Sequence, residues 1–219
     1  APVGVFCLIA RTFSGLGFDA MIPMFKYMAS VLIALALQCC GVYQILLKVF
    51  TGLSPVRFLK KMAPVMSFAF STATSTATIP MNIDTLEEKV GVSRRISSFT
   101  IPLGATINMD GTSIMQGVAV VFVAQAFGIT LTPVDLLTVI ATATLASIGT
   151  AGIPSVGLVT LAMVFDSVGL PTEGIGLIMG IDRILDMART AVNITGDAVC
   201  TTIVAHQEGT LDKEVFRRD

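Results

Sequence analysis

The chain has 219 residues, of which 53% are hydrophobic and only 13% are charged, and its formal net charge is -1. Its mean hydropathy of +0.83 is typical of an integral membrane protein and argues against a soluble domain. A net charge close to zero provides no basic surface for nucleic acid, so we expect no nucleic-acid partner.

Long uncharged runs separate the charged residues. No Lys, Arg, Asp or Glu occurs in residues 27–47, 62–83 or 136–165. A helix needs about 20 apolar residues to span the hydrocarbon core of a bilayer, and each of these runs reaches that length. The sequence therefore predicts an all-α, multi-span membrane protein embedded in a lipid bilayer.

The first residues, APVGVFCLIA, contain neither an initiator Met nor a basic stretch, so we interpret the chain as the later part of a longer protein. Residues 1–23 are predicted to form a partial helix and loop, and residues 24–61 a transmembrane helix with its cytoplasmic connection. The four cysteines lie in or beside apolar runs without metal-ligand spacing, so we interpret them as small hydrophobic residues.

The positive charges predict an orientation in the membrane. Lys and Arg flank residues 62–83 on both sides and recur in the tail at 208–219, whereas the loops near 128–135 and 166–177 contain neither. Lys and Arg in short loops remain on the cytoplasmic side. Both ends of residues 62–83 should therefore lie inside, both ends of residues 136–165 outside, and the C-terminal tail in the cytoplasm.

Two segments that enter and leave by the same face are predicted to be re-entrant hairpins, at 62–95 and 136–166. The first contains SFAFSTATSTATIP, which we expect Pro80 to interrupt, and the second contains ASIGTAGIPS, whose glycines and proline break a helix. Irregular backbone at membrane depth is tolerated only inside protein or beside a cavity. We therefore expect the two tips to meet near the midplane.

Each hairpin precedes an apolar helix with an expected polar break. Residues 96–135 contain TINMDGT at 106–112, and the final helix at 167–207 contains NITGD at 193–197. A hairpin followed by a broken helix, occurring twice in opposite orientations, is the inverted repeat of secondary transporters. Close helix packing through small residues is the simpler interpretation, but it does not explain the acidic residues.

Five polar residues form a stripe in the final helix: Asp182, Asp186, Arg189, Asn193 and Asp197. On a helix they fall within a strip roughly 80° wide and roughly 22 Å long. Ionisable groups at bilayer depth are costly, so this stripe should face protein, ions, water or substrate. A buried Arg189–Asp186 ion pair that only fixes the helix is the alternative, since a spacing of three permits it.

Three motifs resemble the glutamate transporter family, the dicarboxylate and amino acid:cation symporters. They are SFTIPLGATINMDGT at 98–112, ASIGTAGIP at 146–154 and DRILDMARTAVNITGD at 182–197. The resemblance runs from APVGVF, similar to the family's fifth transmembrane helix, through its eighth, and its first four helices have no counterpart here. It implies a homotrimer when full-length, in the plasma or inner membrane, whose protomers move by an elevator mechanism.

The resemblance implies L-glutamate or L-aspartate as the substrate. Arg189 would grip the side-chain carboxylate and Asp186 the ammonium, while Asn193 and Ser75 would hold the α-carboxylate. The other implied substrate contacts are Thr112 and Thr190. The implied gate tips are Thr74, Thr76, Gly149, Gly152, Ile153 and Pro154.

Sodium is the implied coupling ion, because carboxylate and carbonyl oxygens suit a hard cation, and no cofactor is expected. The first implied site comprises Gly104, Asn108, Asn193 and Asp197. The second comprises Thr106, Ser147, Ile148 and Thr150. The third begins with Asn108 and Asp110. We expect Asp110 to be buried and unpaired, which argues against a simple kink at NMDGT.

One arginine departs from the family pattern. Family members carry an extra arginine at the first hairpin tip or directly after the position of Asp186, and here those positions hold Ala73 and Met187. Arg183 lies one turn before Met187 and is the candidate replacement. Our hypothesis is that it pairs with Asp182 or Asp186 when the substrate site is empty.

The sequence thus predicts a sodium-driven symporter of glutamate or aspartate, with a proton-coupled or C4-dicarboxylate carrier as alternatives. Asp186 would repel a dicarboxylate that lacks an ammonium, and a neutral substrate would leave Arg189 buried without a carboxylate. An enzyme is disfavoured because the one histidine, His206, ends the last helix and no nucleophile motif occurs. A channel is disfavoured because two gates at one site suit alternating access.

Overall fold

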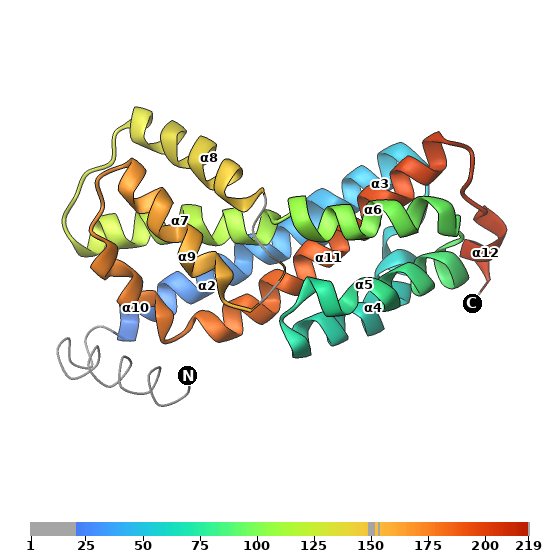
Figure 1. Cartoon of the computed structure of the whole chain (residues 1–219), viewed down its shortest axis with the longest axis horizontal. Helices are drawn as coiled ribbons and strands as arrows, with labels where there is room; N and C mark the ends of the chain where they lie inside the picture. The colour runs from blue at the N-terminus through green and yellow to red at the C-terminus, as the bar shows by residue number, and fades with distance from the viewer. Residues whose placement is uncertain (1–20, 149–151, 153, 219) are drawn as a thin grey trace.

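The computed structural model describes residues 21–148, 152 and 154–218, and these residues are almost entirely helical. Element labels follow Figure 1. The first half contains α2 (Met21–Leu37), η2 (Gln38–Val42), α3 (Tyr43–Thr51), α4 (Pro55–Thr72), α5 (Ser75–Thr85), η3 (Leu86–Val90) and α6 (Arg94–Ile107). The second half contains α7 (Asp110–Ala126), α8 (Pro133–Ser147), α9 (Val156–Ser167), η4 (Thr172–Gly174), α10 (Ile175–Met179), α11 (Asp182–Gln207) and α12 (Lys213–Arg217).

Two helical stretches are long and apolar enough to cross a membrane, within the part of the chain that the structure describes. They are Ile22–Thr51 and Arg94–Ala126. The first joins α2 and α3 through η2, a π-helical turn that keeps the helix continuous. The second is α6 followed by α7, with Asn108 and Met109 outside helical geometry between them. The break predicted within TINMDGT is therefore present.

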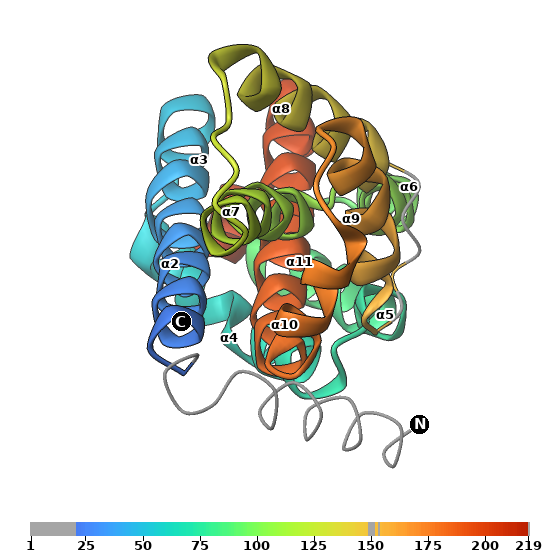
Figure 2. The same cartoon turned by 90° about the vertical axis from the view of Figure 1, so that its left-hand side faces the viewer.

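Helix α11 runs through the centre of the molecule, surrounded by the other helices (Figure 2). Every residue from Arg189 to Val199 is buried. The predicted break at 193–197 is wrong, because α11 is continuous from Asp182 to Gln207. The Thr195 hydroxyl donates to the Ala191 carbonyl of the same helix at 2.7 Å. Its hydrogen bond is therefore satisfied within the helix and does not interrupt the backbone hydrogen bonds.

Gly196 serves close packing in this continuous helix. A Cβ at Gly196 would lie 2.5 Å from the Tyr43 hydroxyl and 2.8 Å from the Asn108 amide nitrogen. The absent side chain thus lets α11 approach α3 and the break between α6 and α7. This packing accounts for the glycine within the segment 193–197, where a polar break was predicted.

Gly196→Ala is therefore expected to lower the melting temperature of the purified protein, because Tyr43 and Asn108 must move. Gly117→Ala is the matched control, since no atom lies within 4 Å of a Cβ at that position in α7. It should stabilise the protein by up to about 1 kcal/mol through helix propensity. Equal effects of the two substitutions on thermal unfolding in detergent would contradict the packing argument.

Two antiparallel helix pairs occupy opposite halves of the long axis, and in each pair the end of the first helix and the start of the second lie toward the middle (Figure 1). The first pair is α4 and α5, and the second is α8 and α9. Ala73 ends α4 in the left-handed conformation, with φ 52°. The interruption predicted at Pro80 is wrong: Pro80 lies exposed inside α5, where one lost backbone hydrogen bond does not end the helix.

The C-terminal residues pack back onto the protein. Leu211 forms an isolated antiparallel bridge with Val92, and the Asp212 N–H donates to the Gly91 carbonyl at 2.8 Å. The Lys213 ammonium donates to the Thr51 carbonyl at 2.9 Å, and Phe216 is buried. These contacts hold α12 beside the beginning of α4 and η3.

Candidate functional site

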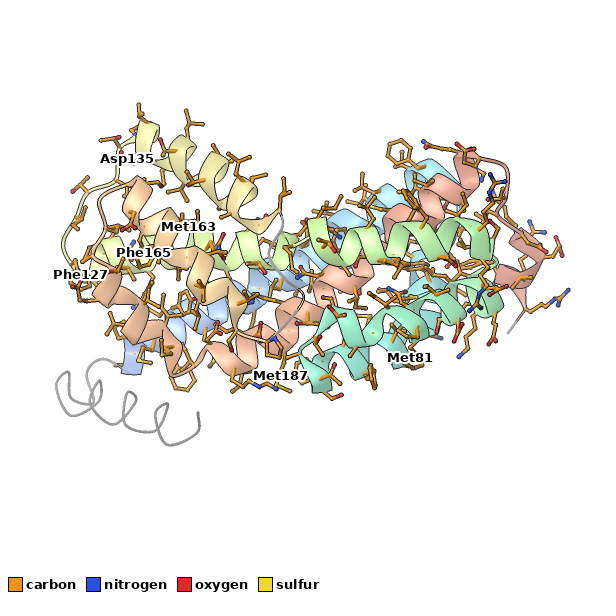
Figure 3. The ribbon with its side chains drawn as sticks, viewed as in Figure 1. Met81, Phe127, Asp135, Met163, Phe165 and Met187 are labelled. Carbon is orange, nitrogen blue, oxygen red and sulfur yellow. The ribbon has the colours of Figure 1, made fainter. Side chains whose placement is uncertain are left out.

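A small cavity lies where the turns of the two helix pairs approach α11. Its lining residues are Ala73, Ser75, Met109, Thr112, Gly152, Val156, Gly157, Asp186, Arg189, Thr190 and Asn193. The six residues predicted to contact a substrate are all in this lining. Met187, next to Asp186, lies near the middle of the long axis (Figure 3), so the cavity is distant from both ends of the molecule.

Arg189 is the most deeply buried charge of the cavity. Its guanidinium, 1% exposed, donates to Asp186 Oδ1 at 2.8 Å and to Asp182 Oδ1 at 3.0 Å. Asp182 and Asp186 are themselves buried. The pairing with Asp186 was the alternative considered from the sequence. Asp182 was placed on the same stripe, but as a possible partner of Arg183 and not of Arg189. Its offset of seven from Arg189, two helical turns, was the signal that could have found it.

Three buried polar atoms around Arg189 have no hydrogen-bond partner among the described residues. They are Arg189 Nε, Asp182 Oδ2 and the Tyr27 hydroxyl. Unsatisfied buried polar groups are costly, and buried charges usually bind their full set of partners. The guanidinium therefore retains an unused donor even while both carboxylates contact it.

The two turns close over the cavity and contact each other. The Thr74 hydroxyl donates to the Gly152 carbonyl at 2.6 Å, and the Thr76 hydroxyl approaches the same oxygen at 3.4 Å. The Ser155 N–H donates to Asp186 Oδ2 at 2.9 Å. Of the other predicted gate residues, Pro154 is exposed, and Gly149 and Ile153 lie outside the described residues.

Helix N-termini also point toward this region. Ser75 is the first residue of α5 and Val156 the first of α9, and both line the cavity. A helix N-terminus carries a partial positive charge and free N–H groups, so both ends favour an anion between the turns. This arrangement supplements the charge of Arg189.

The cavity has a volume of about 20 Å³, enough for roughly one water molecule. Pockets for small organic ligands are typically hundreds of Å³. An amino acid can therefore enter only if the turns separate, and the Thr74–Gly152 hydrogen bond joins these two turns. The structure corresponds to a closed arrangement of the two helix pairs.

The four residues of the first predicted cation site lie together. Asn108 donates to Asp197 Oδ1 at 2.8 Å and approaches the Asn193 carbonyl at 3.3 Å. A Cβ on Gly104 would lie 2.5 Å from the same Asp197 oxygen. Asp197 is only 3% exposed, and among the described residues its side chain accepts a hydrogen bond from Asn108. A buried carboxylate with so few donors is a suitable ligand for a cation.

The second predicted cation site is only partly assembled. Ser147 and Ile148 line a cavity of about 370 Å³, which Asp110 also lines. The Ser113 hydroxyl donates to the Ser147 hydroxyl at 2.9 Å. Thr106 is exposed and donates to the Pro102 carbonyl at 3.1 Å, while Thr150 lies outside the described residues.

The expectation that Asp110 is buried and unpaired is wrong. Asp110 is partly buried, and its Oδ2 accepts hydrogen bonds from the Tyr43 hydroxyl at 2.8 Å and the Gln38 amide at 3.0 Å. Both donors lie in the first apolar run, about 70 residues away along the chain. Sequence patterns could not indicate these partners, because only the tertiary packing of the first apolar run beside α7 brings them to Asp110.

Arg183 lies beside the cavity without lining it. Its guanidinium is 4.0 Å from Asp186 Oδ2, and its side chain is 56% exposed. Asp186 thus contacts Arg189, Arg183 and the Ser155 N–H. This position is compatible with the predicted pairing of Arg183 and Asp186, although the ion pair is long and solvent-screened.

Arg189 has carboxylate partners of its own, so a neutral substrate would not leave it without a carboxylate, contrary to the expectation from the sequence. In the structure Asp182 and Asp186 both contact Arg189. An internal carboxylate can therefore occupy the guanidinium when no substrate carboxylate is present.

The sequence is similar to known proteins over most of its length. The chain matches the sodium:dicarboxylate symporter family over residues 1–207. It is 41% identical over 208 residues to an excitatory amino acid transporter of Caenorhabditis elegans, covering 94% of this chain and 41% of that protein. It is 42% identical over 204 residues to excitatory amino acid transporter 3 of Mus musculus, covering 93% and 39%. It is 39% identical over 200 residues to neutral amino acid transporter B(0) of Mus musculus, covering 90% and 36%. The chain thus spans 36–41% of the length of these relatives.

Proposed function

The chain belongs to the sodium:dicarboxylate symporter family, whose members are membrane transporters and not enzymes, and from this premise we propose that it binds and imports glutamate or aspartate. The observation that carries the proposal is Arg189, a fully buried guanidinium lining a closed polar cavity with one unused donor. The planar fork of an arginine suits bidentate recognition of a carboxylate. A substrate side-chain carboxylate would take the place of Asp182 or Asp186 on this guanidinium.

Two carboxylates beside Arg189 give the site its preference for a zwitterionic acid. When a substrate carboxylate binds Arg189, Asp186 becomes available to the substrate ammonium. Asn193, Ser75, Thr112 and Thr190 would hold the α-carboxylate and the remaining polar groups. A dicarboxylate without an ammonium would leave Asp186 facing another anion, so we rank a C4-dicarboxylate carrier lower.

Sodium is the proposed coupling ion. The buried Asp197 beside Asn108, Gly104 and Asn193 supports a first site. Asp110, with Asn108, supports another, in which Tyr43 and Gln38 would be displaced or reoriented by the ion. Ser147 and Ile148, with Thr106 and Thr150, remain the proposed second site. Proton coupling is the alternative, because a buried carboxylate can also bind a proton.

The proposed architecture follows from the two helix pairs. We interpret α4–α5 and α8–α9 as re-entrant hairpins, each followed by a longer helix, in an inverted repeat. The tips would separate to admit substrate, and the whole unit would move against a scaffold in an elevator mechanism. The orientation proposed from the Lys and Arg distribution puts the C-terminus in the cytoplasm of the cell membrane. A homotrimer is the proposed assembly of the full-length protein.

A neutral amino acid carrier is the second candidate. It is favoured by the two internal carboxylates on Arg189, which remove the need for an acidic substrate side chain. The similar proteins include a neutral amino acid transporter as well as excitatory amino acid transporters. The two candidates differ in whether the substrate displaces an aspartate from Arg189.

Titration calorimetry on the purified protein in detergent tests the proposal. The ligands are L-aspartate, L-glutamate, L-serine and succinate, each in sodium and again with choline replacing sodium. We expect binding of aspartate or glutamate only in sodium. Serine binding without aspartate binding would favour the neutral carrier, and succinate binding would favour a dicarboxylate carrier. Acidic amino acid binding that is equal in sodium and choline would contradict sodium coupling.

A further inference from the structure

Helix α12 lies at one end of the long axis (Figure 1), and a large basic cavity lies beside it, far from the substrate cavity. Its volume is about 650 Å³, and it lies between the first turns of α4, the η3 turn and the C-terminal segment. Five cationic residues line it, Arg57, Lys60, Lys61, Lys89 and Arg218, with one acidic residue, Glu88. The cavity therefore has a strong positive charge and room for a small organic anion.

Most of these cations lack an acidic partner. Among the residues that the structure describes, Arg57, Lys60, Lys89 and Arg218 form no ion pair. Arg94, by contrast, contacts both Asp84 and Glu87 near the same end. Cations that converge without counter-charges repel one another, and a bound anion would relieve that repulsion.

The fold itself brings the cations together. Lys61 donates to the Arg218 carbonyl at 2.6 Å and lies 5.7 Å from the centre of the Phe216 ring. Phe216 is buried, and Lys213 attaches the same segment to the Thr51 carbonyl. The wall that carries Arg218 is thus fixed by specific contacts with α4 and α3.

The beginning of α4 adds backbone donors to this wall. Ser54 and Val56 line the cavity, and the Ser54 side chain makes no capping hydrogen bond with the helix. In this 18-residue helix Pro55 has no N–H and the Phe58 N–H donates to the Ser54 carbonyl at 3.0 Å, so the N–H groups of Val56 and Arg57 are the donors at the positive end of its dipole. Val56 and Arg57 both line the cavity, so backbone donors are present beside the cationic side chains, which favours an anion with several acceptor oxygens.

We propose that this cavity binds a phosphomonoester, either on a soluble phosphorylated metabolite or on the headgroup of an anionic lipid. A phosphomonoester carries close to two negative charges and three acceptor oxygens, which matches donors from three separate segments better than a carboxylate does. No lining residue is shared with the substrate cavity. The phosphate site is therefore independent of the transported substrate.

The test compares two charge-matched variants of the protein purified in detergent. Arg57→Gln with Lys60→Gln removes two cations from the cavity, and Lys48→Gln with Arg95→Gln removes two exposed cations near the same end but outside it. The probes are inositol trisphosphate, dioctanoyl phosphatidylinositol bisphosphate and dioctanoyl phosphatidylserine, which lacks a phosphomonoester. Binding is measured by calorimetry, and thermal unfolding without ligand verifies that each variant is folded.

We expect the first variant to bind the phosphomonoester probes about 25-fold more weakly, roughly fivefold for each lost charge. The affinity of the control variant for the same probes should change little. Binding of the inositol trisphosphate would assign the site to soluble phosphates as well as lipids, and binding of the lipid probe alone would assign it to lipid headgroups. Equal weakening in both variants would show diffuse surface attraction and overturn the proposal. So would equal binding of phosphatidylserine, or no binding of any probe by the unsubstituted protein.

Discussion

Arg189→Gln is expected to weaken the binding of an acidic amino acid by roughly 100-fold or more, because the substrate carboxylate loses its buried bidentate partner. Calorimetry with aspartate or glutamate in sodium measures the effect. The same substitution leaves Asp182 and Asp186 buried without a cation, which costs about 3–5 kcal/mol of stability. Loss of folding must therefore be separated from loss of recognition.

A second variant separates them. Arg189→Gln combined with Asp182→Asn removes one of the two uncompensated carboxylates and should recover much of the melting temperature without recovering acidic-substrate binding. Arg183→Gln, the same charge change on an exposed residue of α11, should alter affinity at most about fivefold. Tight aspartate binding by a folded double variant would remove Arg189 from the substrate site.

Crosslinking the two turns is expected to abolish substrate binding, and reduction should restore it. A Cβ on Gly152 would lie 2.9 Å from Thr76 Oγ1, so Thr76→Cys and Gly152→Cys place two thiols within reach of a disulfide. The oxidised protein would hold the substrate cavity at its closed volume of about 20 Å³. The four native cysteines are first replaced by alanine, and binding is measured before and after reduction.

The matched control is a disulfide that leaves the turns free. Thr142 and Ser167 are 3.2 Å apart between hydroxyl oxygens, and both belong to the α8–α9 pair. Thr142→Cys with Ser167→Cys should therefore crosslink within one pair and retain binding when oxidised. Binding that survives the crosslink between Thr76 and Gly152 would mean that the substrate reaches its site without separation of these turns.

The sequence predicted the part of the site that one helix carries. The offsets of Asp186, Arg189 and Asn193 imply a shared face on any helix, and these residues do line one cavity. Ser75 and Thr112 were predicted as substrate contacts from the family resemblance and not from their spacing in the sequence. Periodicity could contribute only within α11, because it contains no information about which helix packs beside it.

The errors have physical causes. A glycine within NITGD indicates a break as readily as a close contact, and only the position of Tyr43 distinguishes them. Pro80 indicates an interruption, but the chain turns two helical turns earlier at Ala73, a residue type that seldom adopts a positive φ. The partners of Asp110, Gln38 and Tyr43, come from a distant, uncharged run, and its sequence does not indicate which helix they face.

The π-helical turn at Gln38–Val42 makes the length of the first apolar helix as important as its composition. A π turn holds about one residue more than an α turn, so it is equivalent to a single-residue insertion. Gln38 and Tyr43 are five residues apart and share a face in π geometry, but would point about 140° apart in a regular α-helix. Deleting one residue here would regularise the helix and separate the two donors that meet at Asp110. Insertions and deletions in this stretch should thus be tolerated less well than conservative substitutions.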